Sequence, residues 1–418
     1  MKKLSLTSKT LLALFLGASF GIFLSNIHPN WFTQTLLLDG FLKLMGTGFL
    51  NAIKMIVVPL VFVSIVYATA SLDDLKKIGR IGGKTFLLYT LTTTIAIMLA
   101  LLVGGLLKPG VGVDLALLQA NESATTTVAT KVHFIDTLLN MIPTNIFAAF
   151  SEGNILGVIF FAILLGLSMT MVGEKAKPLL TLLEATNEVL LKLVQIIMKF
   201  APYGVFSLLA TTFANFGFSA LLPLIKYVFT VVIGLGLQFL IVYMGMLVVI
   251  GKLNPMPFIK KFAPIFNICL STASSSAALP MSLERAETSF GVSKHISSFT
   301  LPLGSTINMD GTAIMQGISV MFIAQIYGIS LGLNDYLMVI LSAVLASIGT
   351  AGVPGVGMVM LTMVLASVNL PLEGIALIMG VDRIIDMLRT AVNVAGDNIC
   401  TILIAKSEHE LDETIYNK

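Results

Sequence analysis

Residues 381–397 read Val381-Asp-Arg-Ile-Ile-Asp-Met-Leu-Arg-Thr-Ala-Val-Asn-Val-Ala-Gly-Asp397, inside a long apolar run. Five polar residues of this stretch are separated by four, three, four and four positions, which places them on one face of an α-helix. These residues are Asp382, Asp386, Arg389, Asn393 and Asp397. Arg383 points about 100° away from this stripe. It is expected either to extend to the membrane interface or to pair with protein, and we assign it no binding role.

Charged side chains inside such an apolar run need an explanation. Each costs about 3 kcal/mol or more within a bilayer, so it usually faces a cavity and has a function. The stripe holds three carboxylates and one guanidinium and cannot neutralise itself, and Asp310 adds a further acid. Metal or ammonium cations would balance this charge, and the planar fork of Arg389 suits a ligand carboxylate. The stripe predicts a site for an anionic group with cations; a structural ladder of ion pairs between helices is the alternative.

The composition of the whole chain supports a membrane setting. Of 418 residues only 11% are charged and 56% are hydrophobic, the net charge is +3 and the mean hydropathy is +0.96. A soluble protein carries about 25% charged residues. These values exclude a soluble enzyme, a disordered chain, a coiled coil and a nucleic-acid binder, and they indicate a polytopic membrane protein. Cys269 and Cys400 both lie in apolar runs, so no disulfide framework is expected.

Helix-length apolar runs predict eight spans, because about 20 apolar residues cross a bilayer as a helix. Several runs exceed one crossing and predict tilted or broken helices. The runs are residues 10–27, 40–70, 82–107, 133–172, 182–215, 222–251, 294–327 and 372–405. Lysine and arginine concentrate before span 1 and after spans 2, 4 and 6, which predicts that both termini are cytoplasmic.

Two further apolar segments, 258–290 and 334–368, are interrupted by small polar residues. The interruptions are Ser271-Thr-Ala-Ser-Ser-Ser276 and Gly349-Thr-Ala-Gly-Val-Pro-Gly-Val-Gly357. Lipid cannot satisfy the backbone groups of such a break, so these segments must be buried in protein or line a polar cavity. Broken segments of this kind point to a substrate site, with close helix packing as the alternative.

Two more clusters carry polar side chains in apolar surroundings. Span 7 contains Thr306-Ile-Asn-Met-Asp-Gly-Thr312, where Gly311 beside Asn308 and Asp310 predicts unwound backbone with oxygen ligands for monovalent cations. Span 3 contains Tyr89-Thr-Leu-Thr-Thr-Thr94, which alone indicates an interhelical hydrogen-bond patch.

With these residues assembled, the chain resembles the dicarboxylate/amino acid:cation symporter family, which includes glutamate and aspartate transporters of the sodium-coupled prokaryotic type. The matching motifs, in the family's order, are Lys54-Met-Ile-Val-Val-Pro-Leu60, Ser274-Ser-Ser-Ala-Ala-Leu-Pro280, Asn308-Met-Asp-Gly-Thr312, Gly349-Thr-Ala-Gly-Val-Pro354 and Asp386-Met-Leu-Arg-Thr-Ala-Val-Asn-Val-Ala-Gly-Asp397. The resemblance implies an all-α polytopic membrane protein with eight transmembrane helices, two re-entrant helical hairpins and a glutamate-transporter-like elevator fold, assembled as a homotrimer.

The resemblance also implies a division of the chain. Residues 1–72 (spans 1 and 2) and 111–220 (an outer loop with spans 4 and 5) would form a scaffold. Residues 73–110 (span 3) and 221–406 (span 6, hairpin 1, span 7, hairpin 2 and span 8) would form the transport domain. Residues 407–418 would be a cytoplasmic tail.

Substrate-binding residues follow from motif position. Arg389 would hold the side-chain carboxylate of an acidic amino acid, Asp386 its ammonium group and Asn393 its α-carboxylate. The implied set is Ser274, Ser275, Met309, Thr312, Ala351, Gly352, Val353, Pro354, Gly357, Asp386, Arg389, Thr390 and Asn393.

Three sodium sites are implied in the same way, and the loop 349–357 would be the extracellular gate. The first site comprises Gly304, Asn308, Asn393 and Asp397. The second comprises Thr306, Met309, Ser347, Ile348 and Thr350. The third comprises Tyr89, Thr92, Thr93, Asn308 and Asp310.

Three positions depart from related patterns. Archaeal and animal relatives carry an additional arginine where this chain has Ala273 and Met387, so a nearby positive charge is expected to be missing. Gln316 stands where animal relatives carry an acid thought to move a proton, which favours sodium coupling without that proton carrier.

Together these features favour a secondary active transporter in the cell membrane that imports L-aspartate and/or L-glutamate with sodium. Proton-coupled glutamate/aspartate and C4-dicarboxylate carriers of the same family are alternatives, although Asp386, poised for an ammonium group, argues against the latter. An ion channel is the alternative from another class, because polar hairpins and buried charges also line pores. An enzyme is not expected, since no credible nucleophile–base pair is present.

Overall fold

The computed structural model describes residues 6–27, 30–70, 80–112, 142–152, 154–216, 221–348, 352 and 355–418. Within these ranges all regular structure is helical, apart from an isolated antiparallel bridge between Val292 and Leu411. The prediction of an all-α protein is therefore confirmed. Both cysteines are free and buried, as expected. Most of the expected outer loop, from residue 113 onward, lies outside the described residues.

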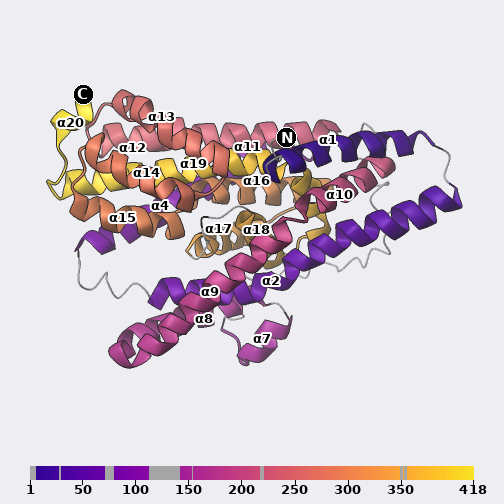
Figure 1. The fold of residues 1–418 in the computed structure, drawn as a ribbon, viewed down its shortest axis with the longest axis horizontal. Coiled ribbons are helices and arrows are strands. Elements are labelled where there is room, and N and C mark those ends of the chain that lie inside the picture. Colours follow the sequence, from indigo (N-terminus) through magenta and orange to yellow (C-terminus); the bar gives the residue numbers. More distant parts are fainter. Residues whose placement is uncertain are drawn as a thin grey trace, which may run out of the picture.

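The first group of helices packs around α2, which contacts α8, α9 and α10, while α1 runs along α10 (Figure 1). The group comprises α1 (Leu6–Ser25), η1 (Phe32–Leu42), α2 (Lys43–Ala70), α7 (Ile146–Glu152), α8 (Ile155–Val172), η2 (Gly173–Ala176), α9 (Lys177–Met198) and α10 (Ala201–Phe216). Glycines make the close α1–α10 contact possible, because a Cβ at Gly17 or Gly21 would lie 2.6 or 2.5 Å from a backbone oxygen of α10.

The second group surrounds α19, which contacts α4, α11, α13, α14, α15 and α16 (Figure 1). The group comprises α4 (Arg80–Leu107), α11 (Leu221–Leu237), η4 (Gln238–Tyr243), α12 (Met244–Val249), α13 (Pro255–Thr272), α14 (Ser275–Thr288), α15 (Lys294–Ile307), α16 (Asp310–Ile326), α17 (Leu333–Ser347), α18 (Val356–Ser367), η5 (Leu372–Gly374), α19 (Ile375–Ser407) and α20 (Glu413–Asn417). The two groups meet where α10 contacts α19 and α2 contacts α18.

The helices of the second group break at the predicted small polar clusters. Helix α13 ends because Ala273 adopts the left-handed conformation (φ 50°, ψ 41°), which is unusual for a residue with a Cβ. The Ser274 hydroxyl then accepts a hydrogen bond from the Ala277 N–H and caps α14. Helices α17 and α18 are separated by residues 348–355, with Gly355 at φ 88°.

The break in span 7 lies within the predicted motif Thr306–Thr312. Asn308 and Met309 separate α15 from α16, whereas Gly311 itself is already helical. This glycine has a different physical role. A Cβ at residue 311 would lie 3.0 Å from the Cα and the carbonyl carbon of Arg389, so glycine is needed for α16 to approach α19.

The surface of the helices suits lipid. By length and composition, three helical runs among the described residues are able to cross a membrane: Arg80–Leu107, Gly157–Met198 and Leu222–Val249. Large apolar side chains such as Leu106, Met171 and Phe229 lie exposed on these runs. Exposed apolar area of this extent is typical of contact with hydrocarbon rather than with water.

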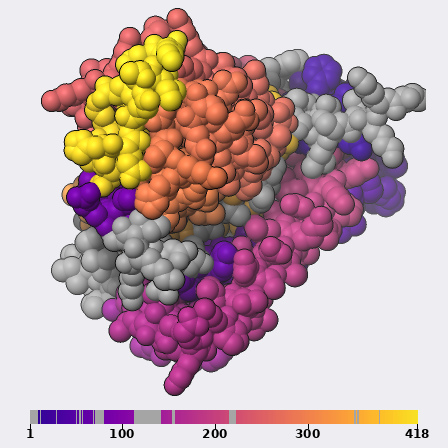
Figure 2. All heavy atoms as spheres, turned by 60° about the vertical axis from the view of Figure 1, so that its left-hand side comes forward, coloured from indigo at the N-terminus to yellow at the C-terminus, as the bar shows by residue number. Residues whose placement is uncertain are grey.

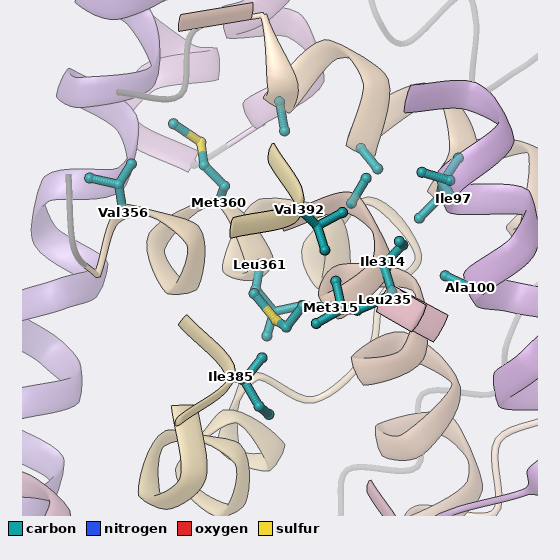
Figure 3. Close-up of a cluster of buried hydrophobic side chains, with 14 of the residues drawn as sticks. Ile97, Ala100, Leu235, Ile314, Met315, Val356, Met360, Leu361, Ile385 and Val392 are labelled. Atoms are coloured by element: carbon teal, nitrogen blue, oxygen red, sulfur yellow. The ribbon is translucent and has the colours of Figure 1, made fainter. Parts of the chain in front are cut away.

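Apolar side chains also fill the interior between α19 and its neighbours (Figure 3). Ile385 and Val392 of α19 lie in the same buried cluster as Ile314 of α16, Leu361 of α18 and Ile97 of α4. This packing fixes the rotation of α19, and with it the direction of its polar stripe.

The C-terminal residues form a folded cap on one end of the second group (Figure 2). The Asp412 N–H donates to the Gly291 carbonyl at 2.8 Å, and Lys261 Nζ donates to the carbonyls of Ile415 and Tyr416, each at 2.8 Å. Tyr416 is fully buried. The expected tail is thus packed against the base of α13 and α14.

Candidate functional site

The polar stripe of α19 lies inside the second group of helices. Because α19 is helical without interruption, the five residues share one buried face, as predicted from their spacing. The buried stripe residues are Asp382, Asp386, Arg389, Asn393 and Asp397.

The first half of the stripe forms a group of ion pairs. Arg389 donates to Asp386 Oδ1 from Nε at 2.9 Å and from Nη2 at 2.7 Å, and its Nη1 lies 3.8 Å from Asp382 Oδ1. Arg383 Nη1 lies 3.5 Å from Asp386 Oδ2. These two acids and two arginines sum to zero charge. The neutralising charge comes from Arg383, which lies off the stripe and pairs with protein, one of the two outcomes expected for it, because residues three apart on a helix are neighbours. The five stripe residues by themselves keep the predicted excess of acids.

A second part of the site keeps uncompensated negative charge. Asp310 accepts hydrogen bonds from the hydroxyl of Thr93 at 2.6 Å and that of Tyr243 at 2.7 Å. Asp397 accepts one from Asn308 Nδ2 at 2.9 Å. In the described part of the chain neither carboxylate forms an ion pair, although both are buried. Buried carboxylates are costly unless they are paired or coordinate a cation, so this part has the chemistry of a cation site.

The structure brings together the residues of the first and third predicted sodium sites. Thr92 of α4 donates to Asn308 Oδ1 at 3.3 Å, and Tyr89 donates to the carbonyl of Thr300 at 3.0 Å. A Cβ at Gly304 would lie 2.6 Å from both Asp397 Oδ1 and the Tyr89 hydroxyl. Glycine at this position therefore allows α15 to lie against both oxygen-bearing side chains.

The second predicted sodium set is only partly assembled. Ser347 donates to the Ile307 carbonyl at 2.9 Å, which joins the end of α17 to the break in span 7. Ile348 is the residue at which α17 ends. The Thr306 side chain is exposed and donates to the Leu303 carbonyl, so it does not reach the others. Thr350 lies outside the described residues.

Asn393 connects the stripe to the break in span 7. Its Oδ1 accepts from the N–H groups of Gly311 and Thr312 at 2.7 and 3.3 Å. Its Nδ2 lies 3.2 Å from both Met309 Sδ and the Thr312 hydroxyl. One turn earlier, the Thr390 hydroxyl donates to the Asp386 carbonyl at 2.7 Å. These predicted substrate residues therefore lie together at the start of α16.

The two interrupted segments meet at this site. The Ser274 hydroxyl donates to the Gly352 carbonyl at 2.7 Å, and Ser275 beside it is buried. A Cβ at Gly357, near the start of α18, would lie 2.5 Å from Cζ of Arg389. Among the described residues, the buried Arg389 Nη1 has no hydrogen-bond partner there. The remaining predicted residues, Ala351, Val353 and Pro354, lie outside the described residues.

Two site residues on η4 were not predicted from the sequence. Gln238 Nε2 donates to Asp310 Oδ2 at 3.3 Å, and Tyr243 donates to the same oxygen. On an α-helix residues five apart point about 140° from one another. In the π-helical η4, the i→i+5 geometry brings them to the same side. The available signal was a pair of polar residues in the otherwise apolar run 222–251.

An apolar helical chain whose interrupted helices enclose buried charges has the architecture of a membrane transporter. Residues 6–407 match the family described as the sodium:dicarboxylate symporter family. The chain belongs to this family.

Three relatives illustrate the range of this family. The chain is 38% identical to the proton/sodium-glutamate symport protein of Geobacillus stearothermophilus, over 99% of this chain and 97% of the relative. It is 39% identical to the proton/glutamate-aspartate symporter of Escherichia coli (strain K12), over 98% and 94% of the two chains. It is 36% identical to the C4-dicarboxylate transport protein of Bacillus subtilis (strain 168), over 89% of each. Because the family and these relatives are transporters, the chain is a membrane transporter and not an enzyme.

Proposed function

We propose that this transporter imports L-aspartate and/or L-glutamate together with sodium ions. The observation that carries the proposal is the buried Arg389, whose Nη1, beside Gly357, has no hydrogen-bond partner among the residues that the structure describes. A guanidinium in this setting suits the side-chain carboxylate of an acidic amino acid. Asp386 next to it suits the ammonium group. The names of two relatives include glutamate or aspartate, which supports the same substrate class.

The remaining contacts assign roles to neighbouring residues. Asn393 and Ser275 bind the α-carboxylate of the substrate, Thr312 assists Arg389, and Thr390 assists Asp386. Four of these side chains carry hydroxyl or amide groups that lie buried between α14, α16 and α19. Because Arg389 is buried, the start of α18 has to move before a substrate reaches it, which fits a gate formed by residues 349–357.

Sodium coupling is proposed from the charge of the site. Asp310 and Asp397 carry two negative charges that the described residues leave without a cationic partner, and hydroxyl, amide and carboxylate oxygens surround them. Sodium ions at the first and third predicted sites would compensate both charges. The second site, at Ser347 and Met309, contains no carboxylate.

The fold supports a division into a scaffold and a moving domain. We place spans 1, 2, 4 and 5 (residues 1–72 and 111–220) in the scaffold, because α1, α2 and α8–α10 pack mainly on one another. Residues 73–110 and 221–406 form the transport domain of an elevator. In this arrangement eight spans cross the membrane, α13–α14 and α17–α18 are re-entrant hairpins, both termini are cytoplasmic, and three copies form the trimer.

Substitution of Arg389 by alanine tests the substrate assignment. In proteoliposomes with an inward sodium gradient, Arg389→Ala should abolish aspartate uptake. Arg80→Ala, which removes an arginine with a 75% exposed side chain at the far end of α4, should retain it. Unchanged aspartate uptake by Arg389→Ala would refute the proposal.

A C4-dicarboxylate substrate is the second candidate, because one relative has that function in its name and Arg383 already neutralises Asp386. Competition by succinate equal to that by aspartate would favour it. Proton coupling is tested separately, by uptake with sodium replaced by choline under an imposed proton gradient. Uptake under those conditions would refute the sodium requirement.

A further inference from the structure

Two guanidinium groups share the carboxylate of Asp386. Arg389 occupies Oδ1 through two short hydrogen bonds, and Arg383 lies against Oδ2 at 3.5 Å. The two arginines differ in their surroundings, since the Arg383 side chain is 13% exposed and that of Arg389 only 3%. Arg383 therefore makes a longer contact with Asp386 than Arg389 does, and its side chain is the more exposed of the two.

The position of Arg383 matters because Asp386 is the proposed partner of the substrate's ammonium group. In this structure a cation of the protein already occupies the outer oxygen of that carboxylate. An ammonium and a guanidinium on the same oxygen repel each other in a site of low dielectric constant. Binding of an amino acid therefore requires that Arg383 leave Asp386, and the contact of Arg389 with Oδ1 can persist.

A dicarboxylate without an amino group has the opposite requirement. If Arg383 left Asp386 in that case, two acids, Asp382 and Asp386, would face a single buried arginine and a dianionic ligand. With Arg383 in place, the four side chains remain neutral and the ligand meets no uncompensated carboxylate. The same arginine thus disfavours one substrate class and permits the other.

We propose that Arg383 determines specificity by acting as a tethered cation that replaces the substrate's ammonium group at Asp386. It lowers the affinity for acidic amino acids and allows C4-dicarboxylates to bind. This inference rests on the proposed function, in which Asp386 receives the ammonium group. It also revises the expectation, drawn from Ala273 and Met387, that no additional positive charge lies near the substrate.

The test compares two ligands of similar size on purified protein in saturating sodium. Calorimetry gives the affinity for L-aspartate and for succinate in the wild type, Arg383→Gln and Arg383→Lys. In Arg383→Gln, aspartate should bind about fivefold more tightly and succinate about fivefold more weakly, as expected for loss of a partly exposed ion pair. Arg383→Lys keeps the positive charge beside Asp386, so it should keep the wild-type ratio of affinities.

The controls separate this role from a structural one. Arg80→Gln removes the arginine of another ion pair, with Glu408, and should change neither affinity. Arg383→Met replaces Arg383→Gln if that variant does not fold, because it retains an unbranched apolar stem. Equal shifts of both affinities in one direction, or no shift in either, would overturn the inference. Failure of the wild type to bind aspartate or glutamate would refute the proposed function instead, and the effect of Arg383 on succinate would still be measured.

Discussion

Substituting alanine for Gly311 should damage both the stability and the affinity of this transporter. The added Cβ would lie 3.0 Å from the Cα and carbonyl carbon of Arg389 and closer still to its carbonyl oxygen, whereas ordinary contacts begin at 3.4 Å. Because these are backbone atoms, α16 and α19 have to separate by about 0.5 Å or more, since a packed interior has no spare volume. That movement also draws the Gly311 N–H away from Asn393 Oδ1, its partner at 2.7 Å.

The expected size follows from these two effects. Overpacking of a core costs about 1–3 kcal/mol, and a weakened buried hydrogen bond adds about 1 kcal/mol. Arg389 and Asn393 are both proposed substrate ligands, so part of this cost is expressed in binding. We expect aspartate affinity to fall by about tenfold or more, which corresponds to 1.4 kcal/mol.

The assay is thermal unfolding of the purified protein, together with calorimetric binding of aspartate in saturating sodium. Gly236→Ala in α11 is the matched control, because a Cβ at that position would meet no atom of the described residues within 4 Å. Its unfolding temperature should stay level or rise slightly, since alanine favours a helix by up to about 1 kcal/mol relative to glycine. The same unfolding temperature and the same aspartate affinity in both variants would refute the conclusion that α16 and α19 need a glycine at position 311 to make their contact.

Three further substitutions address the proposed cation half of the site and the contact between the ends of α4 and α19. Asp397→Asn removes one uncompensated charge and with it the need for one sodium ion. The slope of log affinity for aspartate against log sodium concentration should therefore fall by about one, and an unchanged slope would contradict this. Tyr243→Phe removes a hydrogen-bond donor that competes with sodium for Asp310. The half-saturating sodium concentration in the same titration should therefore fall by up to about fivefold, which corresponds to about 1 kcal/mol. A higher half-saturating concentration would contradict this. Hydrogen bonds from Lys84 and Arg80 lower the pKa of Glu408. The ionised Glu408 therefore stabilises the fold fully above the ordinary glutamate pKa of about 4.3, and this stabilisation is lost as the pH falls through the lowered value. Glu408→Gln should therefore show a smaller drop in unfolding temperature than the wild type between neutral and strongly acidic pH, and equal drops would contradict this.

Features set by local geometry were predictable from the sequence. The stripe of α19 is one of these, because a helix without interruption converts spacing directly into a face. The break at Ala273 and Ser274 is another, since a cluster of small polar residues both weakens a helix and supplies the cap that starts the next one.

Features set by three-dimensional packing were not predictable in this way. Periodicity places the Arg383 backbone off the stripe, but the side chain is long enough to reach Asp386 one turn further on. Gln238 and Tyr243 converge on Asp310 only because η4 is π-helical, and a 3.6-residue repeat points them apart. Gly311 resembled a helix breaker, yet it is the residue that admits the backbone of α19.

The charges of the site fall into two parts that share the first turn of α16. The part around Asp386 is neutral on its own, and the part around Asp310 and Asp397 is not, so cations are needed mainly in the second. Asp310 supplies its carboxylate to the proposed cation part, and the next residue, Gly311, donates its N–H to Asn393 in the proposed substrate part. A cation that moved the backbone of Asp310 would act on the adjacent peptide group and through it on Asn393. The proposed coupling of ion and substrate binding would therefore require no long path through the protein, because one peptide unit in the first turn of α16 joins the two parts. For this reason the Gly311 contact is the most direct test of the proposed site.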